Sequence, residues 1–464
     1  MKHTFLLCIT LAAAMLTGCS LDIPYENQFS DPDAITSPTT ARELLSQAYS
    51  QLPNPELDLA LLTDDLSKTY WAQSNPSMLN LYNWQPQALQ DLSQSLWSGY
   101  YAVIATLNTL SERLPAVEGD EALIAEIGAE AKTLKAYCYF QLLRLYGPTP
   151  RENAEAKAIV LKDAVAMQEL PRSTVAQSVA EIRRLLTEAL EVETRSKAGT
   201  ADWLGLEATR LLLADVELYA GNYPSAASEA QTVIDNVGTD ALSASAYDAL
   251  WAGNPSAARI WGFAHLSTAN GFYLGLMYDR NSGDYFALDA ALAASYRADD
   301  CRRAWSVWEV TTPTMGYQPY LGKYNALRKQ QKEITVVNKL RLEDALFIAA
   351  EAYAHTDAPR AVALLNDYLT RRGAETVDAS LSGDALLRAV LAEKRKEFAG
   401  EGTRYFDLKR HRAGVLSAWT AGQPADRRVS ADDYRWLLPI PRDEYLYNPQ
   451  MDQNPTWPKT SFND

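Results

Sequence analysis

Apolar residues recur at three- and four-residue steps over long parts of this chain, which is the pattern of amphipathic helices. In the clearest stretch, residues 204–237, one apolar run ends at Gly221-Asn222-Tyr223-Pro224 and a second begins directly after it. Glycine and proline end one helix and begin the next, so we predict a helical hairpin with a tight turn. Small residues at Ala214, Ala226 and Ala230 allow its two helices to approach closely.

A second hairpin of the same form is predicted in residues 339–372. Its first helix contains Glu351-Ala352-Tyr353-Ala354, a near copy of Glu217-Leu218-Tyr219-Ala220 in the first hairpin. A single hairpin cannot bury its own apolar face, so hairpins of this kind stack on one another. We therefore expect an all-α dominated fold of stacked, tetratricopeptide-type hairpins. Helical spacing also predicts helices in residues 97–114, 129–147, 174–193 and 384–399.

Two long stretches interrupt the helical pattern. Residues 238–335 are rich in glycine and aromatic residues, which indicates loops and a few short strands between the helical parts. Residues 53–95 contain four prolines together with tyrosine and tryptophan, and they do not keep helical periodicity for long. Long loops on a helical scaffold are where binding function is usually found, so any ligand site is expected in these two insertions.

The N-terminal residues have the form of a targeting segment. After Lys2 and His3, an apolar run that is too short to span a bilayer ends in Leu16-Thr17-Gly18-Cys19. We interpret residues 1–18 as a lipoprotein signal peptide and Cys19 as the lipidated residue; the alternative is an ordinary secretory leader with an incidental cysteine. Residues 19–38 are predicted to form an extended tether, and residues 39–464 a single helical domain that begins with a helix at Thr39.

Charge and the metal-ligating residue types exclude several classes of function. The net charge is −15 without any Lys/Arg-rich run, so the surface would repel a phosphate backbone and no nucleic-acid partner is expected. The four histidines and four cysteines show no metal-binding spacing, and we predict no metal and no cofactor. The sequence leaves open whether Cys138 and Cys301 form a disulfide.

Several motifs, in a fixed order along the chain, resemble the SusD/RagB family of outer-membrane lipoproteins. One departure is Cys301, where that family usually has proline. Arg404 and Asp407 in the C-terminal motif are expected to form structural ion pairs. The motifs are the lipobox at Cys19, the pattern Trp97, Tyr100, Ile104 and Asn108, the helix 129–147, the helix start Leu170-Pro171-Arg172-Ser173, the step Asp299-Asp300-Cys301-Arg302-Arg303, the stretch 391–410, and Leu437-Leu438-Pro439-Ile440-Pro441.

The resemblance implies a SusD-like fold and a function in nutrient uptake. A family member of this kind is a lipid-anchored protein of the outer membrane that faces the exterior, binds an oligosaccharide and delivers it to a SusC-like TonB-dependent barrel. Some relatives bind peptides instead. Two other classes remain as alternatives: a glycoside hydrolase, which needs two carboxylates across the sugar bond, and a protein-interaction scaffold. No motif isolates a catalytic pair, so we expect a binding protein and no catalytic residue.

Candidate ligand contacts follow from the chemistry of a sugar ring. Its C–H face stacks on flat aromatic rings, and its hydroxyl edge pairs with amide, carboxylate or guanidinium groups. Two segments supply both kinds of group, and the resemblance implies that family members place ligand contacts in loops from these two parts of the chain. We predict Trp71, Trp84 and Tyr273 as stacking surfaces and Asn75, Asp279 and Arg280 as hydrogen-bonding partners. The alternative is that these aromatic residues pin their loops to the core.

Overall fold

The structure is a computed structural model of the whole chain. The structure describes residues 34–166, 168–193, 201–266, 285–312, 316–324, 334–417 and 426–459. Helices dominate these residues, as the periodicity predicts. The α-helices are α2 (Pro38–Ser50), α3 (Glu56–Leu61), α4 (Pro76–Tyr82), α5 (Pro86–Arg113), α6 (Glu121–Tyr146), α7 (Pro150–Asn153), α8 (Val175–Leu190), α9 (Leu206–Ala220), α10 (Tyr223–Val237), α11 (Ala244–Trp251), α12 (Ala290–Ala294), α13 (Cys301–Ser306), α14 (Leu342–Thr356), α15 (Ala358–Arg372), α16 (Gly383–Glu397), α17 (Thr403–Arg410) and α18 (Arg442–Tyr447).

Short strands and single turns of 3-10 helix fill part of the space between the helices. The described strands form four two-stranded antiparallel ribbons: β1–β3, β2–β6, β4–β5 and β7–β8. The strands are β1 (Leu66–Lys68), β2 (Arg259–Leu266), β3 (Phe286–Leu288), β4 (Val307–Thr312), β5 (Gly316–Leu321), β6 (Ile334–Arg341), β7 (Val415–Ser417) and β8 (Arg427–Val429), and the 3-10 turns are η2 (Tyr70–Ser74), η3 (Leu114–Ala116), η4 (Thr239–Leu242) and η7 (Tyr434–Trp436).

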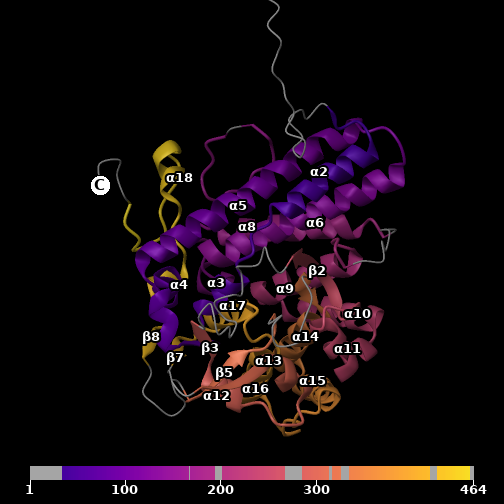
Figure 1. Cartoon of the computed structure of the whole chain (residues 1–464). Coiled ribbons are helices and arrows are strands. Elements are labelled where there is room, and N and C mark those ends of the chain that lie inside the picture. The colour runs from indigo at the N-terminus through magenta and orange to yellow at the C-terminus, as the bar shows by residue number, and fades with distance from the viewer. Residues whose placement is uncertain are drawn as a thin grey trace, which may run out of the picture.

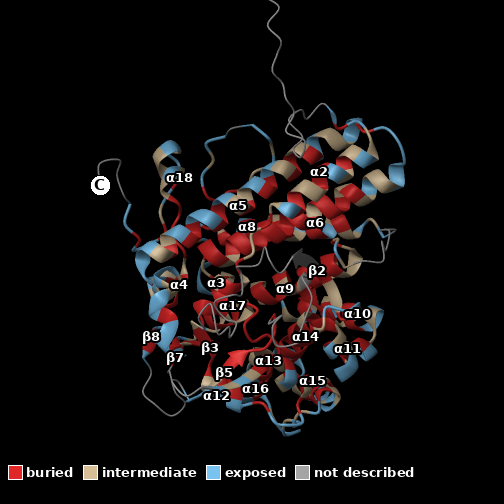
Figure 2. Ribbon diagram, in the orientation of Figure 1, coloured by how far each residue is buried: buried red, intermediate tan, exposed pale blue. Residues whose placement is uncertain are grey.

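The helices follow one another as a continuous stack. The long helices α5 and α6 pack together with α2 and α8, then α8 packs on α9, α10 on α14, and α14 on α15 and α16. In Figure 1 the first group forms an upper layer and the two hairpins lie below it, while β3, β5, β7 and β8 lie toward the lower left and α18 stands at the upper left. Figure 2 shows buried residues along the interfaces between these helices and exposed residues on the outer faces of α5 and α2.

The two predicted hairpins are present, as α9–α10 and α14–α15. Helix α9 ends at Gly221, which has a φ of 80°, and proline lies in the first turn of α10. Only glycine adopts this left-handed conformation readily, which explains the residue at the turn. The buried Ala214, Ala226 and Ala230 lie on these helices, α9 and α10, which pack against each other.

The repeated Glu-x-Tyr-Ala sequence has a structural counterpart in each hairpin. The buried Glu217 of α9 accepts hydrogen bonds from two nitrogens of Arg183 on α8, with N–O distances of 2.5 and 3.0 Å. The buried Glu351 of α14 pairs in the same manner with Arg410 of α17, and also contacts His411. Burial alone would raise the pKa of Glu351, but Arg410 and His411 hold it well below its ordinary value. Each hairpin is therefore joined to another helix through a buried carboxylate.

Some local predictions need correction. Helix α2 begins at Pro38 rather than at Thr39, because the Ser37 hydroxyl accepts the hydrogen bond from the Thr40 backbone N–H that caps the helix. Residues 53–95 are more helical than expected, with α3, η2, α4 and the start of α5, since three of their four prolines lie at or within a residue of helix starts. The ribbon β7–β8 lies outside the predicted strand region, as does β1.

Two further questions from the sequence are settled in the described residues. Cys138 is buried, Cys301 is half-buried, and both are free thiols, so they do not form a disulfide. Within the ranges given above, no helix combines the length and the apolar character that a membrane span needs.

Candidate functional site

The short ribbon β1–β3 brings together the two segments in which the sequence predicts ligand contacts. Lys68, the last residue of β1, lies opposite Phe286, the first residue of β3. The pairing continues beyond the strands, because both the backbone N–H and the hydroxyl of Thr69 donate to the carbonyl of Tyr285, at 2.9 and 3.1 Å. Residues 70–75 leave the ribbon at this end, and the chain that contains Tyr273, Asp279 and Arg280 returns to it here. These three residues lie in 267–284, outside the described residues.

Directly after the ribbon, Tyr70 and Trp71 form an exposed aromatic pair. Their rings meet edge to face, with centroids 5.1 Å apart and an interplanar angle of 87°. Tyr70 is 59% exposed and Trp71 41% exposed, whereas most aromatic residues in the described ranges are buried. The Thr69 hydroxyl also accepts a hydrogen bond from the Trp71 backbone N–H at 3.2 Å, which caps η2 and fixes the pair relative to the ribbon. Exposed aromatic area held in one place by the backbone is typical of binding surfaces. We call this pair the aromatic platform.

Asn75 lies at the next turn, half-buried. Its side-chain oxygen accepts a hydrogen bond from the Met78 backbone N–H at 3.2 Å and so caps α4. The oxygen is committed to the cap, and the amide nitrogen is the part of Asn75 that can donate to a ligand. The structure thus gives Asn75 a structural role beside the platform, while its predicted ligand contact stays a prediction.

The prediction that Trp84 is a stacking surface is wrong. Its side chain has no exposed area. The ring stacks on Tyr405 at a centroid distance of 6.2 Å and meets Trp436 edge to face at 4.7 Å, and its Nε1–H donates to the Leu62 carbonyl at 3.1 Å. Trp84 directly follows α4, and the C-terminal residues Tyr405 and Trp436 cover its ring, while the Leu62 carbonyl after α3 takes up its N–H group.

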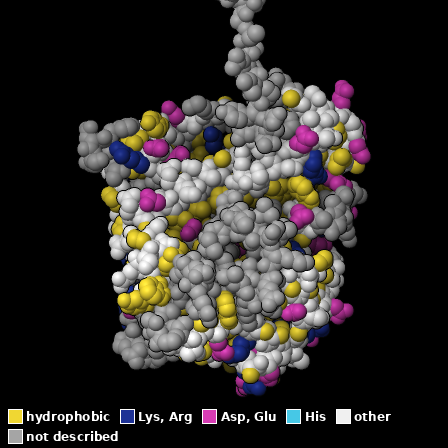
Figure 3. Space-filling model, in the orientation of Figure 1, with side chains coloured by type: hydrophobic (Ala, Val, Ile, Leu, Met, Phe, Trp, Pro, Cys, Tyr) yellow, Lys and Arg dark blue, Asp and Glu magenta, His cyan; other side chains and the backbone are white. Residues whose placement is uncertain are grey.

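The ends of a third segment, which precede and follow residues 418–425, contact β1 along its length. The Ser417 hydroxyl of β7 donates to the Leu66 carbonyl of β1 at 3.1 Å, and Lys68 forms an ion pair with Asp426 at 3.0 Å. Leu416 is 53% exposed. Figure 3 shows hydrophobic side chains gathered on this face, over β7 and β8. Residues 418–425, between the two ends, lie outside the described residues.

Largely shielded ion pairs, in which Asp65 is buried and Asp64, Arg395 and Arg404 are half-buried, hold the base of the ribbon to the C-terminal motif. Arg404 donates two hydrogen bonds to the Asp64 carboxylate, at 2.9 and 3.0 Å, and Arg395 lies 3.2 Å from Asp65. Burial by itself raises the pKa of Asp64, but Arg395 and Arg404 bring it below its ordinary value. The predicted structural role of Arg404 is confirmed. Asp407 is likewise ion-paired, to Lys394 at 2.8 Å.

Asp64 and Asp65 are support residues that sequence reasoning missed. They form an acidic pair directly before β1, at the end of an apolar run. This position carried a usable signal, because buried carboxylates need cations, and the Arg-rich motif at 391–410 supplies them. Their partners are more than 300 residues away in sequence, so no local pattern connects the two.

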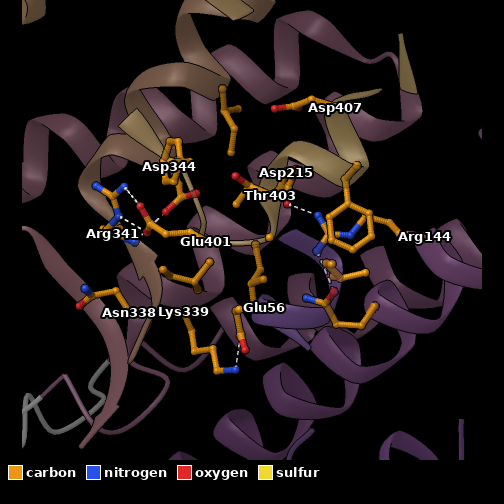
Figure 4. A pocket seen from close by; sticks show the side chains of 18 of the residues that line it. Glu56, Arg144, Asp215, Asn338, Lys339, Arg341, Asp344, Glu401, Thr403 and Asp407 are labelled. Carbon is orange, nitrogen blue, oxygen red and sulfur yellow. Dashed lines mark hydrogen bonds and ion pairs between the residues drawn. The ribbon is translucent and has the colours of Figure 1, made fainter. Parts of the chain in front are cut away.

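A small enclosed cavity lies between α3, α6, β6 and α17, with a volume of about 110 Å³. Figure 4 shows its lining of charged side chains that pair with one another: Arg341 with Glu401, Lys339 with Glu56, and Arg144 with Asp215. Burial raises the pKa of Asp344, on the cavity wall, to about 7. Ligand pockets usually measure about 300–1,000 Å³, so this cavity is too small for an oligosaccharide.

A much larger groove, of about 1,450 Å³, lies between α2, α6 and the start of α9. The predicted contacts that the structure describes, Trp71, Asn75 and Trp84, do not line it. Trp203 does, but Arg42 covers its ring at 5.4 Å and Tyr49 meets it edge to face at 5.2 Å. Among the described residues, the aromatic platform is therefore the surface that best fits a sugar ring. The described residues also include no cluster of three or more His, Cys, Asp and Glu side chains that could hold a metal ion.

Two family models match this chain. Residues 300–457 match the model described as SusD family, and residues 24–195 match the model described as "Starch-binding associating with outer membrane". A curated relative, "SusD-like protein P2" of Formosa agariphila, is 24% identical over 411 residues, which are 78% of this chain and 79% of the relative.

Solved structures resemble the whole fold. A SusD superfamily protein from Bacteroides vulgatus has a TM-score of 0.79 at 22% identity, covering 91% of this chain and 100% of its own. A SusD-like carbohydrate binding protein from the same species has a TM-score of 0.76 at 21% identity, with 90% and 97% covered. Surface glycan-binding protein A from Bacteroides uniformis has a TM-score of 0.70 at 20% identity, with 90% and 99% covered. At these identities the likeness establishes the fold.

Proposed function

The chain belongs to the SusD/RagB family, and from this premise we propose that the protein binds an oligosaccharide nutrient at the cell surface and delivers it to a SusC-like TonB-dependent barrel in the outer membrane. The names of two relatives in structure, a carbohydrate binding protein and a glycan-binding protein, support a sugar ligand. The description of the N-terminal family model supports an association with the outer membrane.

The observation that carries this proposal is the exposed aromatic platform of Tyr70 and Trp71. Leaving two large rings in water forfeits the free energy that burial would provide, so a ligand that covers them gains it. The platform stands on a ribbon fixed by backbone hydrogen bonds and by the Asp64–Arg404 ion pair, so little order is lost when a ligand binds. Tyr273, Asp279 and Arg280 belong to the segment that enters the same ribbon, and we propose that they complete the site.

Peptide binding and glycoside hydrolysis are two of the rival functions. A peptide could use the same rings, and a direct binding comparison of oligosaccharides with peptides decides between them. A hydrolase needs one carboxylate that acts as an acid and another that stays ionised across the scissile bond. Around the enclosed cavity, Glu56, Asp215 and Glu401 are each committed to a cation, which favours binding over catalysis. New reducing ends after incubation with a bound glycan would identify an enzyme.

Replacing Trp71 by alanine is expected to weaken oligosaccharide binding at least about tenfold. Truncating an aromatic contact at the centre of an interface typically costs about 2 kcal/mol or more of binding free energy. Because Trp71 is 41% exposed, the melting temperature should stay nearly unchanged. Isothermal titration calorimetry and thermal unfolding measure the two effects. We predict the same result for Tyr273→Ala.

Tyr447→Ala is a matched control for the Trp71 variant. Tyr447 is 71% exposed on α18, in another part of the molecule, and its truncation should leave the affinity unchanged. Equal affinity of Trp71→Ala and the natural protein would remove the aromatic platform from the proposed site.

Replacing Cys19 by alanine is expected to move the protein from the membrane fraction to the soluble one. The change removes the proposed lipid attachment point, and several acyl chains on one cysteine anchor a protein far more firmly than a single chain does. Fractionation followed by immunoblotting measures the shift. Cys301→Ala is the control and should remain bound, because Cys301 lies on α13 within the folded domain. A Cys19 variant that stays with the membrane contradicts lipidation at this residue. From these membranes, the SusC-like barrel is expected to co-purify with the unaltered protein.

A further inference from the structure

The sequence that carries the aromatic platform and continues beyond it contains no charged residue before Asp91. From Thr69 to Gln90 the sequence has no Asp, Glu, Lys or Arg, whereas the chain average of 22% would place about five there. The stretch is nevertheless polar and largely on the surface. Beyond the platform itself, its exposed hydrogen-bonding residues are Gln73, Ser74, Ser77, Asn80, Asn83, Gln85 and Gln87. Surface helices normally carry charges on their outer face, so this composition calls for a specific reason.

Helix α4 aligns part of these residues in a row. Ser77 and Asn80 of α4 and its C-cap residue Asn83 follow one another at three-residue steps, which places them on the same side of the helix. The opposite face is buried through Leu81 and Tyr82. Because α4 is capped by Asn75 and begins one turn after Trp71, the row starts beside the platform and leads away from it. With seven residues, α4 is about 10 Å long.

Amide and hydroxyl side chains suit an uncharged polyhydroxylated ligand. They both donate and accept hydrogen bonds, as sugar hydroxyls do, and they carry no net charge. A uronate or sulfated sugar would instead need an Arg or Lys that is free to pair with it. Lys68, a described cation of the ribbon, pairs with Asp426 at 3.0 Å. The predicted contact Arg280 directly follows Asp279 in the sequence, so this pair of residues adds no net charge to the site.

We propose that the ligand is an electrically neutral oligosaccharide, whose chain extends from the aromatic platform along the row Ser77–Asn80–Asn83 of α4. This inference rests on the proposed function and adds the charge class of the ligand and the direction in which it runs. The row supplies hydrogen bonds for sugar units beyond the one that stacks on Trp71.

A matched control position lies farther along the chain. After Asp91 the sequence is again free of charge until Glu112, and Figure 3 shows the strip over α5 mostly in white, the colour of uncharged polar side chains and backbone. Gln94 of α5 is exposed and donates to the Ser98 hydroxyl at 2.9 Å. It has the same chemistry as Asn80 but is separated from the α4 row by Asp91.

The first experiment compares polysaccharides that differ in charge. Amylopectin, galactomannan and mixed-linkage β-glucan are each tested beside a form in which part of the C6 hydroxyls is oxidised to carboxylate, by affinity electrophoresis and calorimetry. We expect a neutral polymer to bind at least about tenfold more tightly than its oxidised form. We also expect its affinity to change less than about twofold between 50 and 500 mM NaCl, since no charge is screened.

The second experiment maps the direction. Asn80→Ala and Asn83→Ala should each weaken binding of the same neutral polymer about threefold to tenfold, the loss of one or two hydrogen bonds, while Gln94→Ala leaves it unchanged. Thermal unfolding verifies that all three variants fold. Preference for the oxidised polymers, or full affinity of both α4 variants while Trp71→Ala loses binding, overturns this inference and leaves the proposed function standing. Failure of the unaltered protein to bind any of the six polymers contradicts both.

Discussion

Replacing Arg341 by methionine is expected to lower the free energy of unfolding by about 3–5 kcal/mol, the range for breaking a buried ion pair by removing one partner. Arg341 is 1% exposed. Its guanidinium lies 2.6 Å from Glu397, 2.9 Å from Glu401 and 3.1 Å from Glu343. The substitution keeps most of the volume but leaves three buried carboxylates with fewer cations, so the loss comes from charge rather than from packing.

Urea unfolding of the two proteins measures this difference. The matched control is Arg388→Met: Arg388 is exposed on α16, and its loss should change the stability by no more than about 0.5 kcal/mol. Equal stability of Arg341→Met and the natural protein would show that the network around Arg341 does not hold the C-terminal motif in place.

The same network gives the stability a pH dependence of known sign. Burial raises the pKa of Glu397, but Arg341 and Arg372 outweigh it and lower the pKa from 4.5 to about 2. A carboxylate with a lowered pKa in the folded state stabilises the fold above its unfolded value. The contribution of Glu397 is therefore complete above pH 4.5 and is lost as the pH falls toward 2. In Arg341→Met, the free energy of unfolding should fall less steeply between pH 4.5 and 2, because Glu397 has lost one of the cations that lower its pKa.

Trp84→Ala is expected to destabilise the protein by about 3–5 kcal/mol, as large aromatic truncations in a core do. The change opens a cavity between Tyr405 and Trp436 and leaves the Leu62 carbonyl without the indole donor. Trp71→Ala, 13 residues earlier, should leave stability nearly unchanged. Thermal or urea unfolding of the two variants provides the contrast.

Trp84→Phe tests whether the effect is one of packing. Phenylalanine refills most of the space without restoring the hydrogen bond to Leu62, so the loss of stability should be clearly smaller than with alanine. If Trp84→Ala kept its melting temperature and lost only ligand affinity, Trp84 would be a ligand contact rather than a core residue.

The sequence alone determined the features that depend on neighbouring residues. Helical periodicity located every long helix, and Gly221 with Pro224 marked the turn of the first hairpin, because backbone conformation at a turn is a local property. The sequence alone also shows the stretch without charge from Thr69 to Gln90 and the order of the family motifs. In each case the information lies within a few residues of the position concerned.

The tertiary structure alone decided the roles that depend on contacts across the chain. Trp71 and Trp84 lie in the same uncharged aromatic stretch, and no local pattern separates them. Trp84 is buried only because Tyr405 and Trp436 pack on it. The C-terminal motif reads as a helix with charges three and four residues apart, yet Arg395 and Arg404 pair with Asp65 and Asp64. A side chain that can satisfy its charge or bury its ring in several ways takes the partner that the fold presents, and that partner is here more than 300 residues away.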